Sequence, residues 1–108
     1  MNRLALLIAF LSISAAAYVA YTAEAWPHEA PTGWSYPFLC CSNFDCREVA
    51  ATAIGEGSTG YTIKATGEVL GFSDARLKDS PDGRFHWCSV AGADNSRTIC
   101  LFVPPRGF

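Results

Sequence analysis

Hydrophobic and polar residues alternate most clearly in the last third of the chain, where the pattern predicts two β-strands. Residues 84–90 and 97–103 are rich in aromatic and β-branched side chains, and a polar loop separates them. If Cys88 and Cys100 lie opposite each other, residues 93–95 form a three-residue hairpin loop whose asparagine tolerates the left-handed backbone such loops need. The same register sets aromatic against branched side chains: Trp87 opposite Leu101 and Phe85 opposite Val103.

Shorter alternating stretches predict further elements upstream. Residues 61–72 alternate on both sides of a glycine-containing turn and predict a second hairpin, and residues 47–52 predict a short strand. Residues 73–78 predict one helical turn capped by Ser73. Ser80-Pro81-Asp82-Gly83 has the residues of a type I turn. The predicted fold class is mostly β: a small antiparallel domain of four or five short strands.

The segment before these strands is predicted to be an extended arm. Pro27, Pro31 and Pro37 each fix φ and remove a backbone donor, which excludes a helix or a central strand. We therefore divide the chain into an arm with a cysteine cluster, residues 26–46, and a β domain, residues 47–108. The aromatic rings of the arm either cover the core of the domain or form an exposed strip that docks a partner. The arm side chains that share one face of an extended backbone are Trp34, Tyr36, Phe38 and Cys40.

The first residues have the features of an export signal. Arg3 precedes an uncharged apolar run, and small residues suited to signal cleavage occur before two cut sites, after residue 17 and after residue 25. Residues 1–25 are therefore predicted to be a signal peptide, which sends the protein to the periplasm or the medium. Residues 4–23 also have the length that crosses a hydrocarbon core of about 30 Å. The alternative is an uncleaved anchor in the inner membrane.

Size and charge narrow the class of function. The 83 residues after residue 25 make one small domain, which buries too little apolar surface to be stable without covalent cross-links. The net charge is −2 and the lysine and arginine residues are not clustered, which argues against a nucleic-acid partner. Five cysteines in an exported chain are therefore predicted to form disulfides.

Several pairings of the five cysteines are open. The preferred pattern joins Cys88 to Cys100 across the predicted hairpin, and Cys46 to either Cys40 or Cys41. The unpaired member of the doublet, taken to be Cys41, is then a free thiol or bonds a second chain in a disulfide-linked homodimer. The main rival ties the arm to the hairpin, with one doublet member bonded to Cys88 and with Cys46 bonded to Cys100.

An alternative interpretation uses the cysteines as thiolates. Three thiolates and an imidazole would suit Cu(I) or Zn, or a thiol-redox centre, but the paired C-x-x-C spacing of such sites is absent from the sequence. A triad of Ser89, His86 and Asp82 is also disfavoured, because the serine and the histidine lie on opposite faces of a strand. We predict no catalytic residue, no cofactor and no resident metal. The ligands of the alternative site would be Cys40, Cys41, Cys46 and His86.

Three stretches together resemble a family of small exported bacterial proteins of uncharacterised function. The resemblance implies export and a cysteine framework, and it implies no activity. The stretches are Trp34-Ser35-Tyr36-Pro37 with Cys40-Cys41-Ser42 and Asp45-Cys46, then Ser80-Pro81-Asp82-Gly83-Arg84-Phe85-His86 with Cys88, then Cys100-Leu101-Phe102-Val103-Pro104-Pro105.

Together these features predict a non-enzymatic, exported β domain stabilised by disulfides. We expect it to bind another macromolecule, an unknown protein partner in the cell envelope or outside the cell, through the arm and the cysteine doublet. This expectation rests on size, compartment and fold, not on a recognised site. The alternative function is that of a soft-metal or thiol-redox envelope protein.

Overall fold

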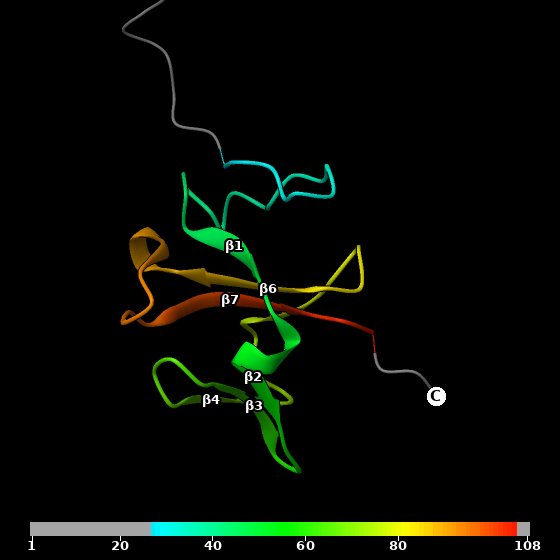
Figure 1. The fold of residues 1–108 in the computed structure, drawn as a ribbon, viewed down its shortest axis with the longest axis vertical. Coiled ribbons are helices and arrows are strands. Elements are labelled where there is room, and N and C mark those ends of the chain that lie inside the picture. Colours follow the sequence, from blue (N-terminus) through cyan, green and yellow to red (C-terminus); the bar gives the residue numbers. More distant parts are fainter. Residues whose placement is uncertain (1–26, 106–108) are drawn as a thin grey trace, which may run out of the picture.

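The computed structural model describes residues 27–105, which form two small β-sheets and an N-terminal arm (Figure 1). A four-stranded sheet has the order β1-β6-β7-β5, and a three-stranded sheet has the order β2-β3-β4. The mostly β prediction is confirmed, with seven strands where four or five were expected. The strands are β1 (Cys46–Val49), β2 (Ile54–Glu56), β3 (Gly60–Ile63), β4 (Glu68–Gly71), β5 (Leu77–Asp79), β6 (Phe85–Ser89) and β7 (Thr98–Val103).

The four-stranded sheet is the middle of three layers, with the arm on one face and the three-stranded sheet on the other (Figure 1). Its central strands, β6 and β7, are buried along almost their whole length. Cys88, Cys100 and Phe102 pack against the arm, whereas Trp87 and Leu101 pack against the three-stranded sheet. Successive side chains of a strand point to opposite faces, so a strand covered on both faces requires apolar residues in a continuous run.

Both predicted hairpins are confirmed. In the hairpin of β6 and β7, Cys88 lies opposite Cys100 and Trp87 lies opposite Leu101, as the pattern predicts. The alternation in residues 61–72 corresponds to β3 and β4, which pair in an antiparallel register. The strand predicted at 47–52 is shorter, because β1 is followed by a 3-10 turn, η1 (Ala51–Ala53).

The tight loop predicted at residues 93–95 is wrong. The register shifts after Cys88, and a 3-10 turn, η2 (Val90–Gly92), takes the chain out of β6. This turn packs on the arm side: Gly92 has a φ of 66°, and a Cβ there would lie 2.7 Å from the Phe44 carbonyl oxygen. Only glycine combines this backbone conformation with so close an approach.

The helical turn predicted at 73–78 is also wrong, because its last residues belong to β5, which pairs parallel to β7. Arg76 accounts for the difference. Its guanidinium bonds Asp74 at 2.7 Å and Glu68 of β4 at 3.0 Å, and its carbonyl accepts a hydrogen bond from the Leu101 N–H at 2.9 Å. The local ion pair with Asp74 and the longer-range contacts to Glu68 and Leu101 hold Arg76 in a turn that leads into β5, and they outweigh the capping signal of Ser73.

The disulfides join different cysteines from those of either predicted pattern. The bonds are Cys40–Cys100, with Cα atoms 5.5 Å apart, and Cys46–Cys88, with Cα atoms 3.9 Å apart. The four cysteines that we expect to form disulfides do so, and Cys41 is the free thiol as expected. The predicted pairing of the four with one another is wrong. The reason is that β6 lies between β1 and β7, so Cys88 has a cysteine opposite it on each side. Cys46 takes Cys88, and Cys100 is left for the arm.

No helix within residues 27–105 is long and apolar enough to cross a membrane. The predicted signal peptide or anchor, residues 1–25, lies outside the described residues. Its cleavage therefore stays a prediction.

Replacing both members of one bridge should give a measurable loss of stability. Because Cys40 and Cys100 are 60 residues apart in the sequence, the double variant C40S/C100S should lower the free energy of unfolding by about 4 kcal/mol in the chain-entropy model. Urea denaturation with and without reductant measures this loss. The matched control is C41S, which should keep both bridges in a non-reducing peptide map. A map that shows a Cys88–Cys100 peptide would contradict the connectivity.

Candidate binding site

The arm folds into a small loop of its own before it reaches the cysteine doublet. Glu29 and Ser35 form an isolated β-bridge, and the Ala30 N–H donates to the Trp34 carbonyl at 2.9 Å. Gly33, with a φ of 94°, closes the turn between them. The arm is therefore locally structured and is not simply an extended strand.

The carboxylate of Asp82 attaches this loop to the sheet. One oxygen accepts hydrogen bonds from the Thr32 hydroxyl at 2.6 Å and the Trp34 indole N–H at 3.0 Å, both in the arm. The other oxygen accepts from the Ser80 hydroxyl at 2.8 Å and the Arg84 N–H at 3.0 Å, both in the turn that holds Asp82. Burial raises the pKa of Asp82, but these side-chain donors, together with His86, outweigh burial and hold the pKa well below its usual range.

A buried chain of hydrogen bonds continues from Asp82 into the arm. His86 is fully buried, its Nε2 lies 2.9 Å from each carboxylate oxygen, and its Nδ1 lies 2.7 Å from the Tyr36 hydroxyl. In the neutral ring, Nε2 donates to the carboxylate and Nδ1 accepts from the tyrosine. Burial and the charge of Asp82 raise the pKa of Tyr36 to about 12, so its hydroxyl keeps its proton at neutral pH. Every buried polar side-chain atom of this hydrogen-bond network has a partner, which is typical of a network that stabilises the fold.

The predicted common face of the arm side chains is confirmed at Trp34 and Tyr36, whose rings pack over His86 and Phe102. It fails at Phe38, which is 67% exposed. The extended phase ends at Pro37, because its carbonyl accepts hydrogen bonds from the N–H groups of both doublet cysteines and closes a turn. The rings of the arm therefore cover the core at Trp34 and Tyr36, and the ring at Phe38 is exposed.

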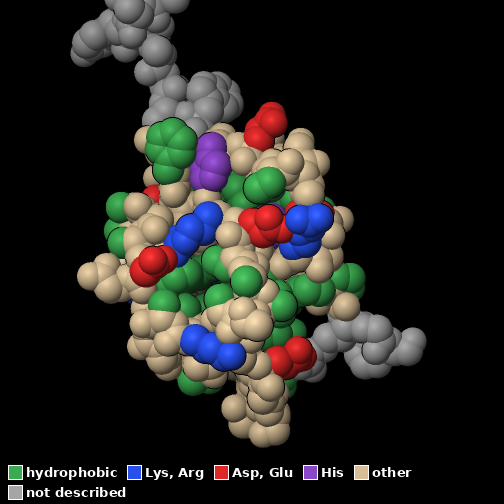
Figure 2. Space-filling view, in the orientation of Figure 1, with side chains coloured by type: hydrophobic (Ala, Val, Ile, Leu, Met, Phe, Trp, Pro, Cys, Tyr) green, Lys and Arg blue, Asp and Glu red, His purple; other side chains and the backbone are tan. Residues whose placement is uncertain are grey.

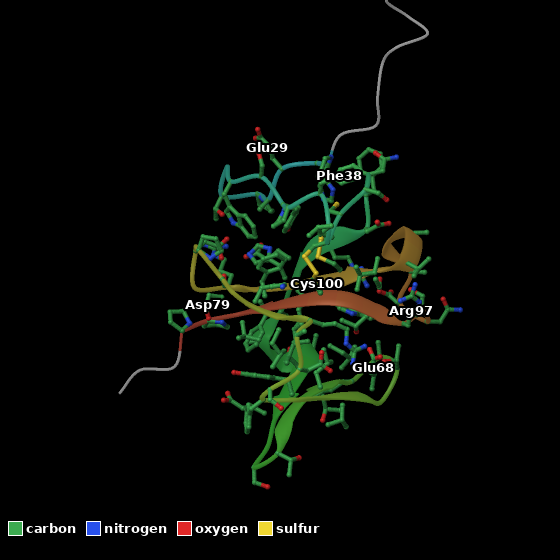
Figure 3. All side chains as sticks on the ribbon, turned by 180° about the vertical axis from the view of Figure 1, so that it is seen from behind. Glu29, Phe38, Glu68, Asp79, Arg97 and Cys100 are labelled. Carbon is green, nitrogen blue, oxygen red and sulfur yellow. A yellow bond between two sulfur atoms is a disulfide. The ribbon has the colours of Figure 1, made fainter. Side chains whose placement is uncertain are left out.

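Three large apolar side chains project from the turns around the cysteine doublet. Phe38 and Phe44 are each 67% exposed and Leu39 is 90% exposed; we call these three residues the apolar tip. Figure 3 shows Phe38 at the end of the molecule remote from the three-stranded sheet, and Figure 2 shows hydrophobic surface at the same end beside a histidine side chain.

Two disulfides attach the segment that carries the apolar tip to the four-stranded sheet. Cys40 is bonded to Cys100 of β7, and Cys46, at the end of the turn, is bonded to Cys88 of β6. Within the turn, the Asp45 carboxylate accepts hydrogen bonds from the backbone N–H and the hydroxyl of Ser42, at 3.1 and 3.0 Å. The two bridges and this local cap hold the backbone on both sides of Phe44, and Phe38 and Leu39 directly precede the first bridge at Cys40.

The free thiol of Cys41 lies under the apolar tip and is fully buried. Its Sγ donates to the Asn43 carbonyl at 3.1 Å. His28 Nδ1 lies 3.0 Å from the same carbonyl and 3.7 Å from the sulfur. A carbonyl oxygen only accepts hydrogen bonds, so Nδ1 carries its hydrogen toward Asn43 and cannot take the thiol proton. The pair is therefore not arranged as a nucleophile and its base.

The alternative metal or redox site is not assembled. Cys40 and Cys46 are used in disulfides, and His86 bonds Tyr36 and Asp82. Within residues 27–105 no group of three or more histidine, cysteine or acidic side chains is placed to hold a metal ion. Ser89, the third member of the disfavoured triad, donates instead to the Ala93 carbonyl and accepts from Arg47.

The sequence reasoning missed the role of Asp82. The residue was assigned to a turn only, and it does occupy that turn, but it also bonds the histidine four residues later and the arm fifty residues earlier. The sequence offered one partial signal, because Asp82 lies only four residues before His86 and the two were considered together in the disfavoured triad. The indole and hydroxyl donors of the arm carried no such local signal.

Comparisons with known proteins do not extend this description. No protein-family model, no curated protein and no solved structure matches the chain. The fold and the site define a small two-disulfide β protein that presents an apolar tip on a rigid arm.

Removing the charge of Asp82 should destabilise the domain in a pH-dependent way. D82N should lower the free energy of unfolding at pH 7 by about 3 kcal/mol, because buried donors lose an anionic acceptor. The folded pKa of Asp82 is depressed, so its contribution is complete above the unfolded pKa of about 4 and is lost as the pH falls below it. Urea denaturation at pH 7 and pH 3 should therefore show a smaller gap between D82N and wild type at pH 3. The exposed neighbour variant D79N is the control, and an equal gap at both pH values would contradict the role of the charge.

Proposed function

We propose that this protein is an exported, non-enzymatic binding module, and that its apolar tip is the surface that docks a protein partner in the cell envelope or outside the cell. The single observation that carries the proposal is the exposure of Phe38, Leu39 and Phe44 on a backbone fixed by two disulfides. Such a patch costs solubility in a free monomer, and in known proteins it commonly marks an interaction site.

The rigidity of the tip supports a binding role. A partner that buries Phe38, Leu39 and Phe44 gains about 1.5–3 kcal/mol for each side chain fully removed from water. Ordering a flexible loop would consume much of this gain, but the bridges at Cys40 and Cys46 have already restricted this one. Aromatic anchors presented without an ordering cost are typical of the central contacts of protein interfaces.

The polar network under the arm supports the same conclusion in a different way. His86 and Tyr36 are buried, Asp82 is half-buried, and the three side chains satisfy one another's hydrogen bonds, so they fix the position of the arm. The arrangement of a histidine between a carboxylate and a hydroxyl is thus used inside the fold.

The proposed localisation is the periplasm or the medium, with an anchored form as the alternative. Disulfide bonds suggest an oxidising setting outside the cytoplasm.

The alternative function, a soft-metal or thiol-redox protein, is less well supported. It requires Cys40 and Cys46 as thiolates, and both are bonded to other cysteines. Membership in the family of small exported proteins named above stays a prediction, and it would not by itself assign an activity.

A photoreactive amino acid placed at Leu39 in the full chain tests the proposal. In living cells it should cross-link one dominant protein, because this side chain is 90% exposed at the centre of the proposed surface. The matched control position is Val69, which is 56% exposed on β4 of the other sheet and should give no such adduct. Mass spectrometry identifies the adduct. Adding the variant F38S to the Leu39 probe should reduce the yield about ten-fold without changing the melting temperature. Equal adducts at both positions would refute the proposal.

A further inference from the structure

A pocket separate from the apolar tip lies where the two sheets meet, along the edge strand β5. Its volume is about 510 Å³. Figure 3 shows Asp79, the last residue of β5, well away from Phe38. A pocket of this volume with mainly apolar and aromatic walls is typical of a binding site. The apolar side chains that line it are Tyr61, Phe72, Leu77, Val103, Pro104 and Pro105.

The side chains of β5 alternate between the two faces of the four-stranded sheet. Leu77 packs against the apolar cluster between the sheets, and Asp79 lies opposite Val103, which belongs to that cluster. Successive side chains of a strand point to opposite faces, so Lys78 points to the face that carries the arm. Leu77 and Asp79 are therefore the two side chains of β5 that face the pocket.

The outer edge of β5 presents backbone groups that could pair with another strand. The backbones of Arg76 and Ser80 hydrogen-bond β7, and alternate residues of a strand direct their N–H and carbonyl groups to the same side. The groups of Leu77 and Asp79 therefore point away from β7. The Leu77 N–H donates to the Asp74 carbonyl at 3.1 Å. Among residues 27–105, the Leu77 carbonyl and both backbone groups of Asp79 have no partner, and such an edge is a template for strand addition.

The charge at this edge is that of one exposed carboxylate. Asp74, also in the pocket wall, is bonded to Arg76 at 2.7 Å. By contrast, no hydrogen bond or ion pair within residues 27–105 holds the side chain of Asp79. A strand that pairs antiparallel with β5 places one side chain beside Asp79 and another, two residues later, beside Leu77. Because opposite charges attract across a strand pair, the edge favours a basic residue at the first position and an apolar one at the second.

We propose that the edge of β5 and the pocket beside it form a second binding site, which takes an extended segment of another polypeptide by strand addition. The segment pairs antiparallel with β5, the orientation that is slightly more stable per residue. It carries lysine or arginine opposite Asp79 and, two residues later, inserts a large apolar side chain into the pocket beside Leu77. This site goes beyond the proposed function of the apolar tip and does not rest on it.

A library of short random peptides displayed on phage tests the site, with protein purified from cells that export the full chain as the target. Peptides enriched on the wild type should share lysine or arginine two positions before a large apolar residue. The variant D79K should instead enrich aspartate or glutamate at the first position, because the charge across the strand pair is reversed. The matched control is K78E on the opposite face, which should keep the wild-type pattern. All three proteins should have the same melting temperature, since Lys78 and Asp79 are exposed.

The backbone contacts are tested with one enriched peptide and two N-methylated derivatives of it. Methylation at the basic residue removes the N–H that donates to the Asp79 carbonyl, and it should weaken the affinity measured by fluorescence anisotropy about ten-fold. Methylation at the residue between the basic and the apolar one falls on an N–H that points away from β5. It should change the affinity by no more than about two-fold.

The contrary outcomes are distinct from those that bear on the tip. No enrichment on the wild type, a pattern that D79K leaves unchanged, or the apolar residue before the basic one would each overturn the proposal. Equal losses from the two methylations would overturn strand addition. Peptides that lose affinity in F38S and keep it in D79K are bound at the apolar tip, which would overturn the second site and leave the proposed function standing.

Discussion

The half-buried carboxylate of Asp82 makes the hydrogen bonds on which the arrangement of the arm depends. An anion partly removed from water needs donors for its oxygens, and here the donors come from the turn, from β6 and from the arm. Without the arm, the carboxylate would lose Thr32 and Trp34 together. The charge therefore favours one position of the arm, whereas the aromatic packing above Phe102 alone would permit several.

The covalent and polar attachments of the arm have different effects on its two ends. Asp82 and His86 hold the loop around Trp34, and the bridges at Cys40 and Cys46 hold the segment that follows. The Pro37 turn leaves Phe38 and Leu39 outside the core, directly before the bridge at Cys40. The burial of Tyr36 and the exposure of these two residues thus follow from one change in the direction of the backbone.

Periodicity predicted the parts of the fold that depend on neighbours in sequence. The β6–β7 register followed from the alternation around Cys88 and Cys100, and the β3–β4 hairpin followed from its turn residues. The disulfides did not follow, because only the placement of β1 beside β6 decides which cysteine Cys88 meets. For the same reason β5 was missed: its pairing with β7 depends on distant partners of Arg76 and not on local propensity. For the aromatic side chains of the arm the sequence left covering the core and exposure both open, and the turn at Pro37 places Tyr36 in the core and Phe38 outside it.

The connectivity of the bridges has a consequence for how the chain matures. The cysteines at 40, 41 and 46 precede both of their eventual partners by at least 42 residues. A chain that enters an oxidising compartment N-terminus first therefore has only these three thiols available at the start, and the short ring between the doublet and Cys46 closes most easily. No bond between the doublet and Cys46 is present in the folded domain, so any that forms early has to be exchanged before Cys46 can pair with Cys88. Each native bond waits for the segment that carries Cys88 or Cys100, so native pairing comes late in the maturation of the chain.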